Sequence, residues 1–155
     1  MLTLSDALSQ DLATVAPRVR RIVSFTLATG VTHHFCDGED EIVDDDGNVC
    51  SPSVIEAEPN SLDVDAFTRE TSFGEMTIRM AADGPARQMV TGVRILRALV
   101  VVRLGTDAVA TDDYVTVFRG TLNPDGAVKV LADGTFAFRC MDAFAVLAER
   151  VATFG

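Results

Sequence analysis

Tryptophan is absent from the 155 residues, and tyrosine and lysine occur once each, the lysine at position 129. Proteins that bind sugars or nucleic-acid bases usually stack them on aromatic side chains, so this scarcity disfavours a binding module of that kind. A catalytic lysine needs a buried setting, whereas Lys129 follows a predicted turn at Asp125 that is exposed to solvent. We therefore assign Lys129 no catalytic role.

Sequence signatures of catalysis and phosphate binding are also missing. The chain has no G-x-S-x-G elbow, no G-x-x-x-x-G-K-[ST] loop and no G-x-G-x-x-G turn. The longest apolar run, residues 99–104, is far shorter than the roughly 20 residues that cross a bilayer. Residues 1–21 contain no apolar stretch of signal-peptide length. These absences predict a soluble protein and disfavour an enzyme, and we assign no catalytic or cofactor-binding residue.

Cysteine is scarce, with three residues, Cys36, Cys50 and Cys140, and no C-x-x-C spacing. This pattern indicates neither a disulfide framework nor a zinc knuckle, and it fits synthesis in a reducing cytosol. Cys36 and Cys50 flank an acidic stretch and could approach each other across a hairpin. The sequence leaves open whether they are bonded.

Charge is strongly one-sided, with a formal net charge of −10 at pH 7. An acidic protein repels the phosphates of nucleic acids and anionic membranes, so neither is an expected ligand. The cations are almost all arginine. Guanidinium groups favour contacts at self-assembly interfaces, but codon usage in a GC-rich genome explains the same bias. Composition alone does not choose between these explanations.

Residues 37–47 carry seven carboxylates around Ile42 and Val43. We expect two turns that flank a short edge strand. Carboxylates are the ligands that calcium prefers, but this segment lacks the alternating D-x-D-x-D-G spacing and the distal glutamate that would aim them at one ion. The segment is therefore interpreted as a solvated cluster of turns.

The His33-His34 pair with Cys36 is the other candidate for metal or nucleophilic chemistry. Neighbouring residues of a strand point to opposite faces, so the two histidines cannot chelate one ion by themselves. His34 and Cys36 share a face, yet two ligands are too few for zinc, and no third group is apparent that would hold a general base for the thiol. No metal site is predicted, and the pair is interpreted as buried or interfacial.

Strand-like segments separated by glycine, proline and Asp-Gly turns make up most of the chain. A strand over residues 19–27 turns at Gly30 into a second strand, forming a hairpin. Residues 75–80 alternate apolar and polar side chains as a half-buried strand does. A short helix runs from Pro85 to Gly92. Residues 97–105 are predicted as a central strand covered on both faces.

The remaining segments complete the prediction. Residues 48–59 are expected to be extended pieces broken at Pro52 and Pro59, and residues 114–140 a three-stranded meander. Helical periodicity appears near both ends of the chain. The predicted fold is mainly β, an antiparallel barrel or sandwich of short strands with a helix near each terminus. We divide the chain into a helical segment 1–18, a β-rich domain 19–140 and a helix 141–155.

Six segments in order carry a resemblance: VSFTLATGVTHHFCDGEDEI, VIEAEPNSLDVDAFTRETSFGEMTIRMA, RALVVVRLG, VFRGTL, AVKVLADGTFAFRC and MDAFAVLAERV. Together they resemble the amino-terminal domain of tailed-phage tail-tip hub proteins, including the lambda minor tail protein L and the hubs of gene transfer agents. The resemblance spans residues 18–151 and consists of apolar patterns and turns.

The resemblance implies a structural protein of the bacteriophage virion, part of a tail-tip or baseplate-hub ring or of a tail connector through which DNA passes unbound. Its implied partners are further copies of itself and the tube, tape-measure and tip proteins, with assembly in the host cytoplasm, location in the viral tail and no membrane contact. Related hubs continue into a cysteine-rich region, whereas this chain stops at Gly155. This departure argues against an iron-sulfur or metal role and suggests a reduced hub or a connector ring. The resemblance carries over no catalytic residue and no cofactor.

The expected interface combines the acidic segment 37–47, the terminal helix and several arginines. Its candidate residues are Asp44, Asp45, Arg69, Arg79, Arg97, Phe144 and Leu147. Contacts of this kind would repeat around a ring by symmetry. Two alternatives stay open: a small ligand-binding β-barrel module, and a hydrolase whose polar residues meet only in the fold.

Overall fold

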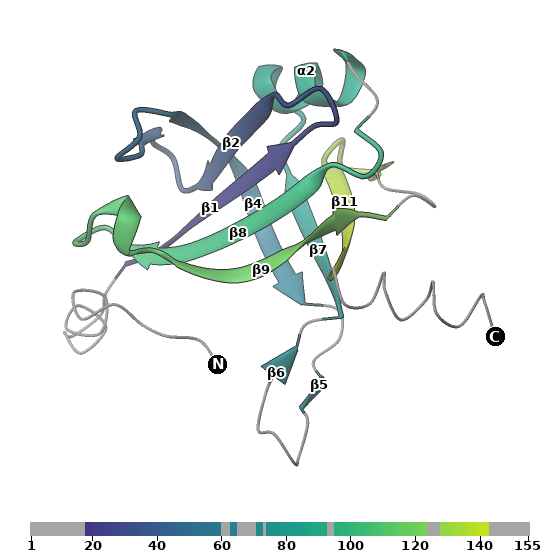
Figure 1. The fold of residues 1–155 in the computed structure, drawn as a ribbon. Coiled ribbons are helices and arrows are strands. Elements are labelled where there is room, and N and C mark those ends of the chain that lie inside the picture. The colour runs from purple at the N-terminus through teal and green to yellow at the C-terminus, as the bar shows by residue number, and fades with distance from the viewer. Residues whose placement is uncertain are drawn as a thin grey trace.

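A closed β-barrel forms the body of the protein (Figure 1). The computed structural model describes residues 18–59, 63–64, 71–72, 74–92, 95–123 and 128–142. The barrel strands are β1 (Val19–Thr26), β2 (Thr32–Asp37), β4 (Val49–Pro59), β7 (Glu75–Met80), β8 (Leu99–Thr106), β9 (Val115–Leu122) and β11 (Phe136–Asp142). They pair in the order β11-β7-β4-β2-β1-β8-β9, and β9 returns to β11 to close the barrel.

Smaller elements decorate this barrel. They are β3 (Ile42–Val43), the pair β5 (Asp63–Val64) and β6 (Thr71–Ser72), helix α2 (Gly84–Gly92), the 3-10 turn η1 (Thr111–Asp113) and β10 (Val128–Val130). β3 pairs with β4, and β10 pairs with β11. No helix in the described ranges is long and apolar enough to cross a membrane.

The predicted mainly β barrel is confirmed, but its sheet is mixed. All neighbouring barrel strands are antiparallel except β2 and β4, which run parallel. After β2, the acidic segment and β3 carry the chain back before β4 begins, so β4 enters in the same direction as β2. Side-chain alternation is identical in parallel and antiparallel strands, which is why the sequence pattern did not reveal this exception.

Side chains fill the barrel interior. Phe25 packs against Phe35 and Phe138, with ring centroids 5.9 and 5.2 Å apart. The inward residues Ile78 and Met80 of β7 are fully buried in the same cluster. Edge-to-face and tilted aromatic contacts of this kind stabilise a core beyond their buried area. The barrel is therefore a packed core rather than a container.

Helix α2 packs onto the barrel and begins where the sequence predicts. Asp83 caps it, because its Oδ1 accepts a hydrogen bond from the Ala86 amide at 3.2 Å. The other oxygen of Asp83 accepts the Ser53 hydroxyl at 2.6 Å and so ties the cap to β4. Ala86 and Met89 are buried in the barrel core.

Several local predictions are confirmed. β1 and β2 form the expected hairpin, which turns at Gly30 with a φ of 87°. Buried and half-buried residues alternate strictly along β7. The edge strand within the acidic segment is β3.

Three local predictions are wrong in detail. β4 runs through Pro52 without a break, because the pairing of β2 with β4 shifts register there, and a bulge tolerates a residue without an amide donor. Residues 114–140 do supply three strands, but β9 and β10 both pair with β11 rather than in meander order. β8 is not covered on both faces, since Leu99 is 42% exposed.

The predicted terminal helices lie outside the described residues. At the carboxyl end, β11 extends through Met141 and Asp142, so these two residues are strand rather than helix. Asp142 pairs with Gly120 of β9, which completes the closure.

Candidate interaction surfaces

The outer surface of β4, β7 and β11 is covered by ion pairs within the chain. Arg79 bridges Glu56 at 3.2 Å and Asp133 at 2.9 Å. Arg139 holds Glu75 at 2.7 Å with two further hydrogen bonds. The arginines of this wall, among them the predicted interface residue Arg79, thus have carboxylate partners in their own chain.

The outer surface of β2, β1, β8 and β9 has a different character. The strand register places one row across the four strands, Thr32, Thr26, Leu99 and Thr121, and a second row, His34, Ser24, Val101 and Arg119. Thr26 and Thr32 share a hydrogen bond at 3.0 Å, as do Ser24 and the His34 Nδ1 at 2.9 Å. We call these eight residues, with Leu96 and Arg97, the carboxylate-free face.

Arg97 lies at the end of this face, in the turn that leads into β8. Its φ of 62° is in the left-handed region, which costs a residue with a Cβ about 1 kcal/mol. Leu96 and Leu99 beside it are 48% and 42% exposed. Among the described residues, Arg97 and Arg119 form no ion pair with a carboxylate. This turn therefore presents a charged and an apolar group together.

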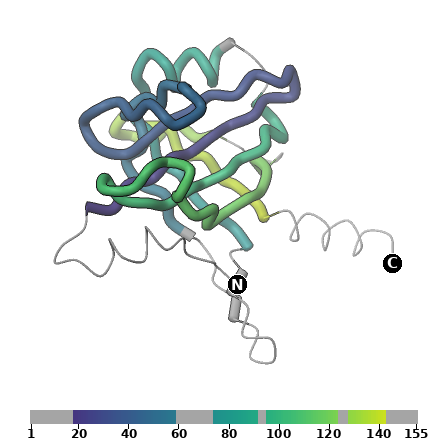
Figure 2. Tube along the Cα trace, turned by 60° about the vertical axis from the view of Figure 1, so that its left-hand side comes forward, coloured from purple at the N-terminus to yellow at the C-terminus, as the bar shows by residue number. Residues whose placement is uncertain are grey.

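A second small core lies on the outside of the barrel at the other end of β8. Ile22, Cys36, Cys50 and Tyr114 are buried together there, beneath residues 37–49, which we call the acidic hairpin. Figure 2 shows the acidic hairpin and the loop after β8 on the same side of the barrel. Burial of its inner side chains fixes the acidic hairpin against the wall.

Arg20 is the charged centre of this second core. It contacts Asp37 at 3.4 Å and Asp107 at 3.1 Å, and it donates a 2.8 Å hydrogen bond to the Asp37 carbonyl. Burial alone would lower the pKa of Arg20, but the hydrogen bond and charge of Asp107, with the charge of Asp37, raise it above its ordinary value. One guanidinium thus joins the acidic hairpin to the loop after β8.

Tyr114 packs directly over Gly105 in the same region. Its hydroxyl donates a 3.1 Å hydrogen bond to the Thr106 carbonyl. A Cβ at position 105 would overlap the tyrosine ring, so this strand position requires glycine.

Asp44 and Asp45, both predicted interface residues, make internal contacts. Asp44 is buried and accepts hydrogen bonds from the Asn48 amide and side chain at 2.7 and 3.1 Å, and Arg103 lies 3.6 Å away. Burial opposes ionisation of Asp44, but these Asn48 bonds and the charge of Arg103 lower its pKa. The acidic hairpin is therefore a structured element.

Asp45 links the acidic hairpin to η1. Its Oδ2 accepts the Thr111 hydroxyl at 3.0 Å and the Asp112 amide at 2.8 Å, while its own amide donates to the Thr111 hydroxyl at 2.9 Å. This reciprocal pair of bonds joins two loops distant in sequence.

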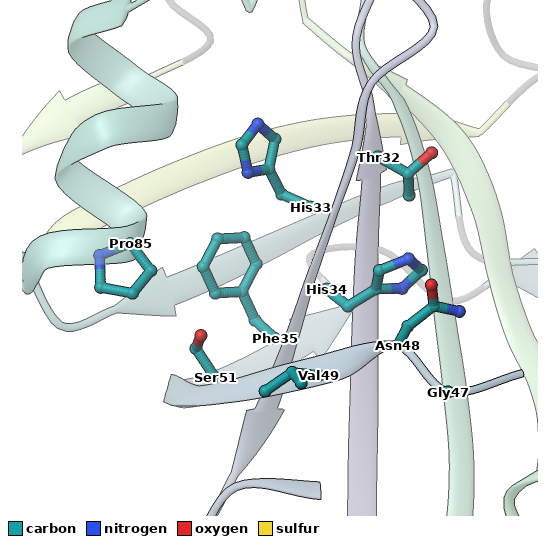
Figure 3. Close-up of a pocket in the computed structure, with 9 residues that line it drawn as sticks. All are labelled: Thr32, His33, His34, Phe35, Gly47, Asn48, Val49, Ser51 and Pro85. Carbon is teal, nitrogen blue, oxygen red and sulfur yellow. The ribbon is translucent and has the colours of Figure 1, made fainter. Parts of the chain in front are cut away.

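A surface hollow of about 390 Å³ opens where β2 and β4 begin (Figure 3). In Figure 3, His33 and Phe35 point toward Pro85 of α2, whereas His34 points to the other side, near Asn48. The expectation that the two histidines occupy opposite faces is confirmed. Burial lowers the pKa of His34, so the neutral ring is favoured.

The three cysteines are free and buried. The Cys36 thiol donates a hydrogen bond to the Cys50 carbonyl at 3.2 Å. Burial raises the pKa of Cys50 to about 11 and that of Cys140 to about 12, which keeps both protonated and poorly nucleophilic at neutral pH. Across the described ranges, no three His, Cys, Asp or Glu residues converge as a metal site would require.

The predicted site residues thus fall into three groups. Asp44, Asp45 and Arg79 are held by contacts within the chain, and Arg97 is exposed. Arg69, Phe144 and Leu147 lie outside the described residues. Their role in an interface stays a prediction.

Sequence reasoning missed the cluster around Arg20, Gly105 and Tyr114. A glycine within a β-branched strand is a signal of close approach by another group, and Gly105 offered that signal. The partner loop could not be named from sequence, because Tyr114 reaches Gly105 only through the fold.

No protein-family model matches the sequence, and no curated protein matches it. Among solved structures, the fold is similar to that of a chain in the virion of a native gene transfer agent (GTA) particle, with a TM-score of 0.68 and 20% sequence identity. The match covers 92% of this chain and 46% of that one, so the present chain spans less than half of its structural neighbour. At this identity, the similarity establishes a shared fold.

Proposed function

We propose that this protein is a structural subunit of a phage-like particle, located at the tail tip, the baseplate hub or a tail connector, where copies form a ring through which DNA passes. The observation that carries the proposal is the fold shared over 92% of the chain with a protein of a GTA virion. The independent resemblance of residues 18–151 to tail-tip hubs supports the finer location.

The negative net charge of the protein is compatible with a channel through which DNA passes. The net charge of −10 repels phosphate, so a genome would slide past the subunit without binding to it. Tube, tape-measure and tip proteins are the proposed neighbours.

A ligand-binding barrel is the second candidate, and the surface hollow is the observation in its favour. Because Phe25, Phe35 and Phe138 fill the barrel, a ligand would have to bind in this open hollow at the start of β2. Small-molecule sites usually bury most of their ligand, so we favour the structural role.

The test is to tag the chain in cells that produce the particles and to purify the particles by density. We expect the tag in intact particles, with immunogold label at one end of the tail, and tailless or tipless particles after deletion of the gene. Normal particles after deletion, with the tagged chain free in the lysate, would contradict the proposal.

A further inference from the structure

Arg97 and Leu99 lie at one end of β8, whereas the acidic hairpin contacts β8 further along the strand, where Asp44 is 3.6 Å from Arg103. Arg97 precedes the first residue of the strand, and Asp107, which Arg20 joins to the acidic hairpin, follows the last. The strand from Leu99 to Arg103 spans about 13 Å, which exceeds the screening length of about 8 Å at physiological salt. In the part of the chain that the structure describes, no ion pair joins Arg97 to the acidic hairpin of its own chain.

The acidic end offers a dense and rigid set of charges. Six carboxylate side chains around it are exposed: Glu39, Asp40, Glu41, Asp45, Asp46 and Asp112. The contacts of Arg20, Asp44 and Asp45 already hold their backbone in place. A partner that docks here would lose little energy to the ordering of a loop.

The surface around Arg97 has the charge and the apolar area that complement the acidic hairpin. Arg97 and Arg119 carry positive charge, and Leu96 and Leu99 provide exposed apolar surface between them. Arginine beside apolar side chains is the composition of interface centres. Asp44 and Asp46 of the acidic hairpin act on His34, at the edge of this face away from Arg97. The left-handed backbone of Arg97 is a local steric cost, and no hydrogen bond or ion pair of its side chain within the described ranges compensates for it.

We propose that the carboxylate-free face of one copy, centred on Arg97, binds the acidic hairpin of a second copy. The inference rests on the proposed function and names the partner of each surface. Because the two surfaces differ, the contact is heterologous and repeats head to tail, which generates a ring when the rotation closes.

Charge reversal tests the contact in the full-length chain. Sedimentation velocity over a range of concentrations should show that the wild type associates, and that association weakens when salt rises from about 0.1 M to about 0.5 M. The variant R97E/R119E and the variant E39R/E41R should each raise the dissociation constant about tenfold or more, because each brings like charges together. R87E/K129E has the same net charge as R97E/R119E and should associate as the wild type does, since Arg87 and Lys129 are exposed outside both surfaces and form no ion pair among the described residues.

Mixing gives the decisive comparison. In an equimolar mixture of R97E/R119E and E39R/E41R, every reversed face meets a reversed hairpin and every native face a native hairpin. Association should return to within a few-fold of the wild type. Circular dichroism of each variant checks that the fold is retained, and the restored mixture excludes misfolding as the cause of the loss.

A wild-type chain that stays monomeric at all concentrations, or a mixture that stays dissociated, would overturn self-docking. The tagged chain in purified particles reports on the proposed function separately. Particle incorporation without self-association would keep the proposed function and reject this inference. If the mixture of the two variants associates as expected but the chain is absent from particles, this inference is supported and the proposed function is rejected.

Discussion

The two halves of the barrel wall differ in their arginines without a carboxylate partner among the described residues. On β4, β7 and β11, Arg79 and Arg139 are paired with carboxylates of the same chain. On the half formed by β2, β1, β8 and β9, Arg97 and Arg119 face a surface of hydroxyl and apolar side chains. The second half also pairs Arg21 with Asp37 and Arg103 with Asp44, but at its other end it leaves charge and apolar area for a partner. Figure 1 shows the strands of both halves.

Arg20 has a third role, which is to stabilise the fold from a buried position. Arg20 has a side chain only 9% exposed and holds the acidic hairpin against the barrel. In the half formed by β2, β1, β8 and β9, the end that contains Arg20 and the acidic hairpin is therefore rigid and internally bonded. The end that contains Arg97 is exposed, and we call it the open end. The substitutions below test this difference, beginning with the largest expected effect.

Gly105→Ala should disrupt the rigid end most strongly. The new methyl group overlaps the Tyr114 ring, and such overpacking should lower the free energy of unfolding by about 3 kcal/mol. Urea denaturation measures the loss. Gly84→Ala, where space is open, is the matched control and should change stability little; equal losses at both sites would show that the close packing is unimportant.

Arg20→Met should remove the charged link while keeping the length of the side chain. Asp37 and Asp107 then lose a buried partner, and we expect a loss of about 2 kcal/mol, moderated by the partial exposure of Asp107. Arg21→Met removes a more exposed partner of Asp37 and should cost far less. Hydrogen exchange of the acidic hairpin should rise only in the first variant.

Arg97→Gly should raise the free energy of unfolding, whereas the two substitutions above lower it. Glycine adopts the left-handed conformation without the steric cost, so thermal unfolding should show a gain of about 1 kcal/mol. Self-association should weaken in the same variant. A loss of stability would mean that the Arg97 side chain supports the fold, contrary to its assignment to the open end.

Asp44→Asn tests the acidic hairpin through pH. The pKa of Asp44 is lowered in the folded state, so its ionised form stabilises the fold above its unfolded pKa of about 3.9, and this contribution is lost as pH falls through the folded value. The wild type should therefore be more stable than the variant at pH 6 by about 1 kcal/mol. The difference should shrink toward pH 3 in urea titrations; a constant difference would reject the ionised Asp44.

Arg79→Ala should have the smallest effect. Its ion pairs are partly exposed and screened, so the free energy of unfolding should fall by about 0.5 kcal/mol or less. Association should be unchanged in sedimentation. A marked loss of association would place the ion-paired half in the interface and remove the contrast between the halves.

The local elements were predictable because each has its cause within a few residues. Gly30 supplies the left-handed turn of the first hairpin, Asp83 and Pro85 begin α2, and the alternation of residues 75–80 defines β7. The direction of β4 and the pairing of β9 with β11 were not predictable, since they depend on partners distant in sequence. Side-chain alternation does not encode the choice of partner.

The candidate site was predictable only in part. Arg97 was selected from an arginine bias, but its left-handed backbone and its exposed neighbours became visible only in the fold. Asp44 was expected on a projecting docking element, yet Asn48 and Arg103 hold it buried, because the turn after β3 folds its carboxylate inward. Buried polar groups acquire partners through tertiary contacts that the sequence does not display.

The most direct test of the account is a cryo-electron microscopy reconstruction of the tail end of the particles that contain this protein. We expect a ring of barrels in which Arg97 of each subunit contacts the acidic hairpin of the next. A reconstruction in which the barrel is absent from the particle, or in which its carboxylate-free face is open to solvent, would contradict the account.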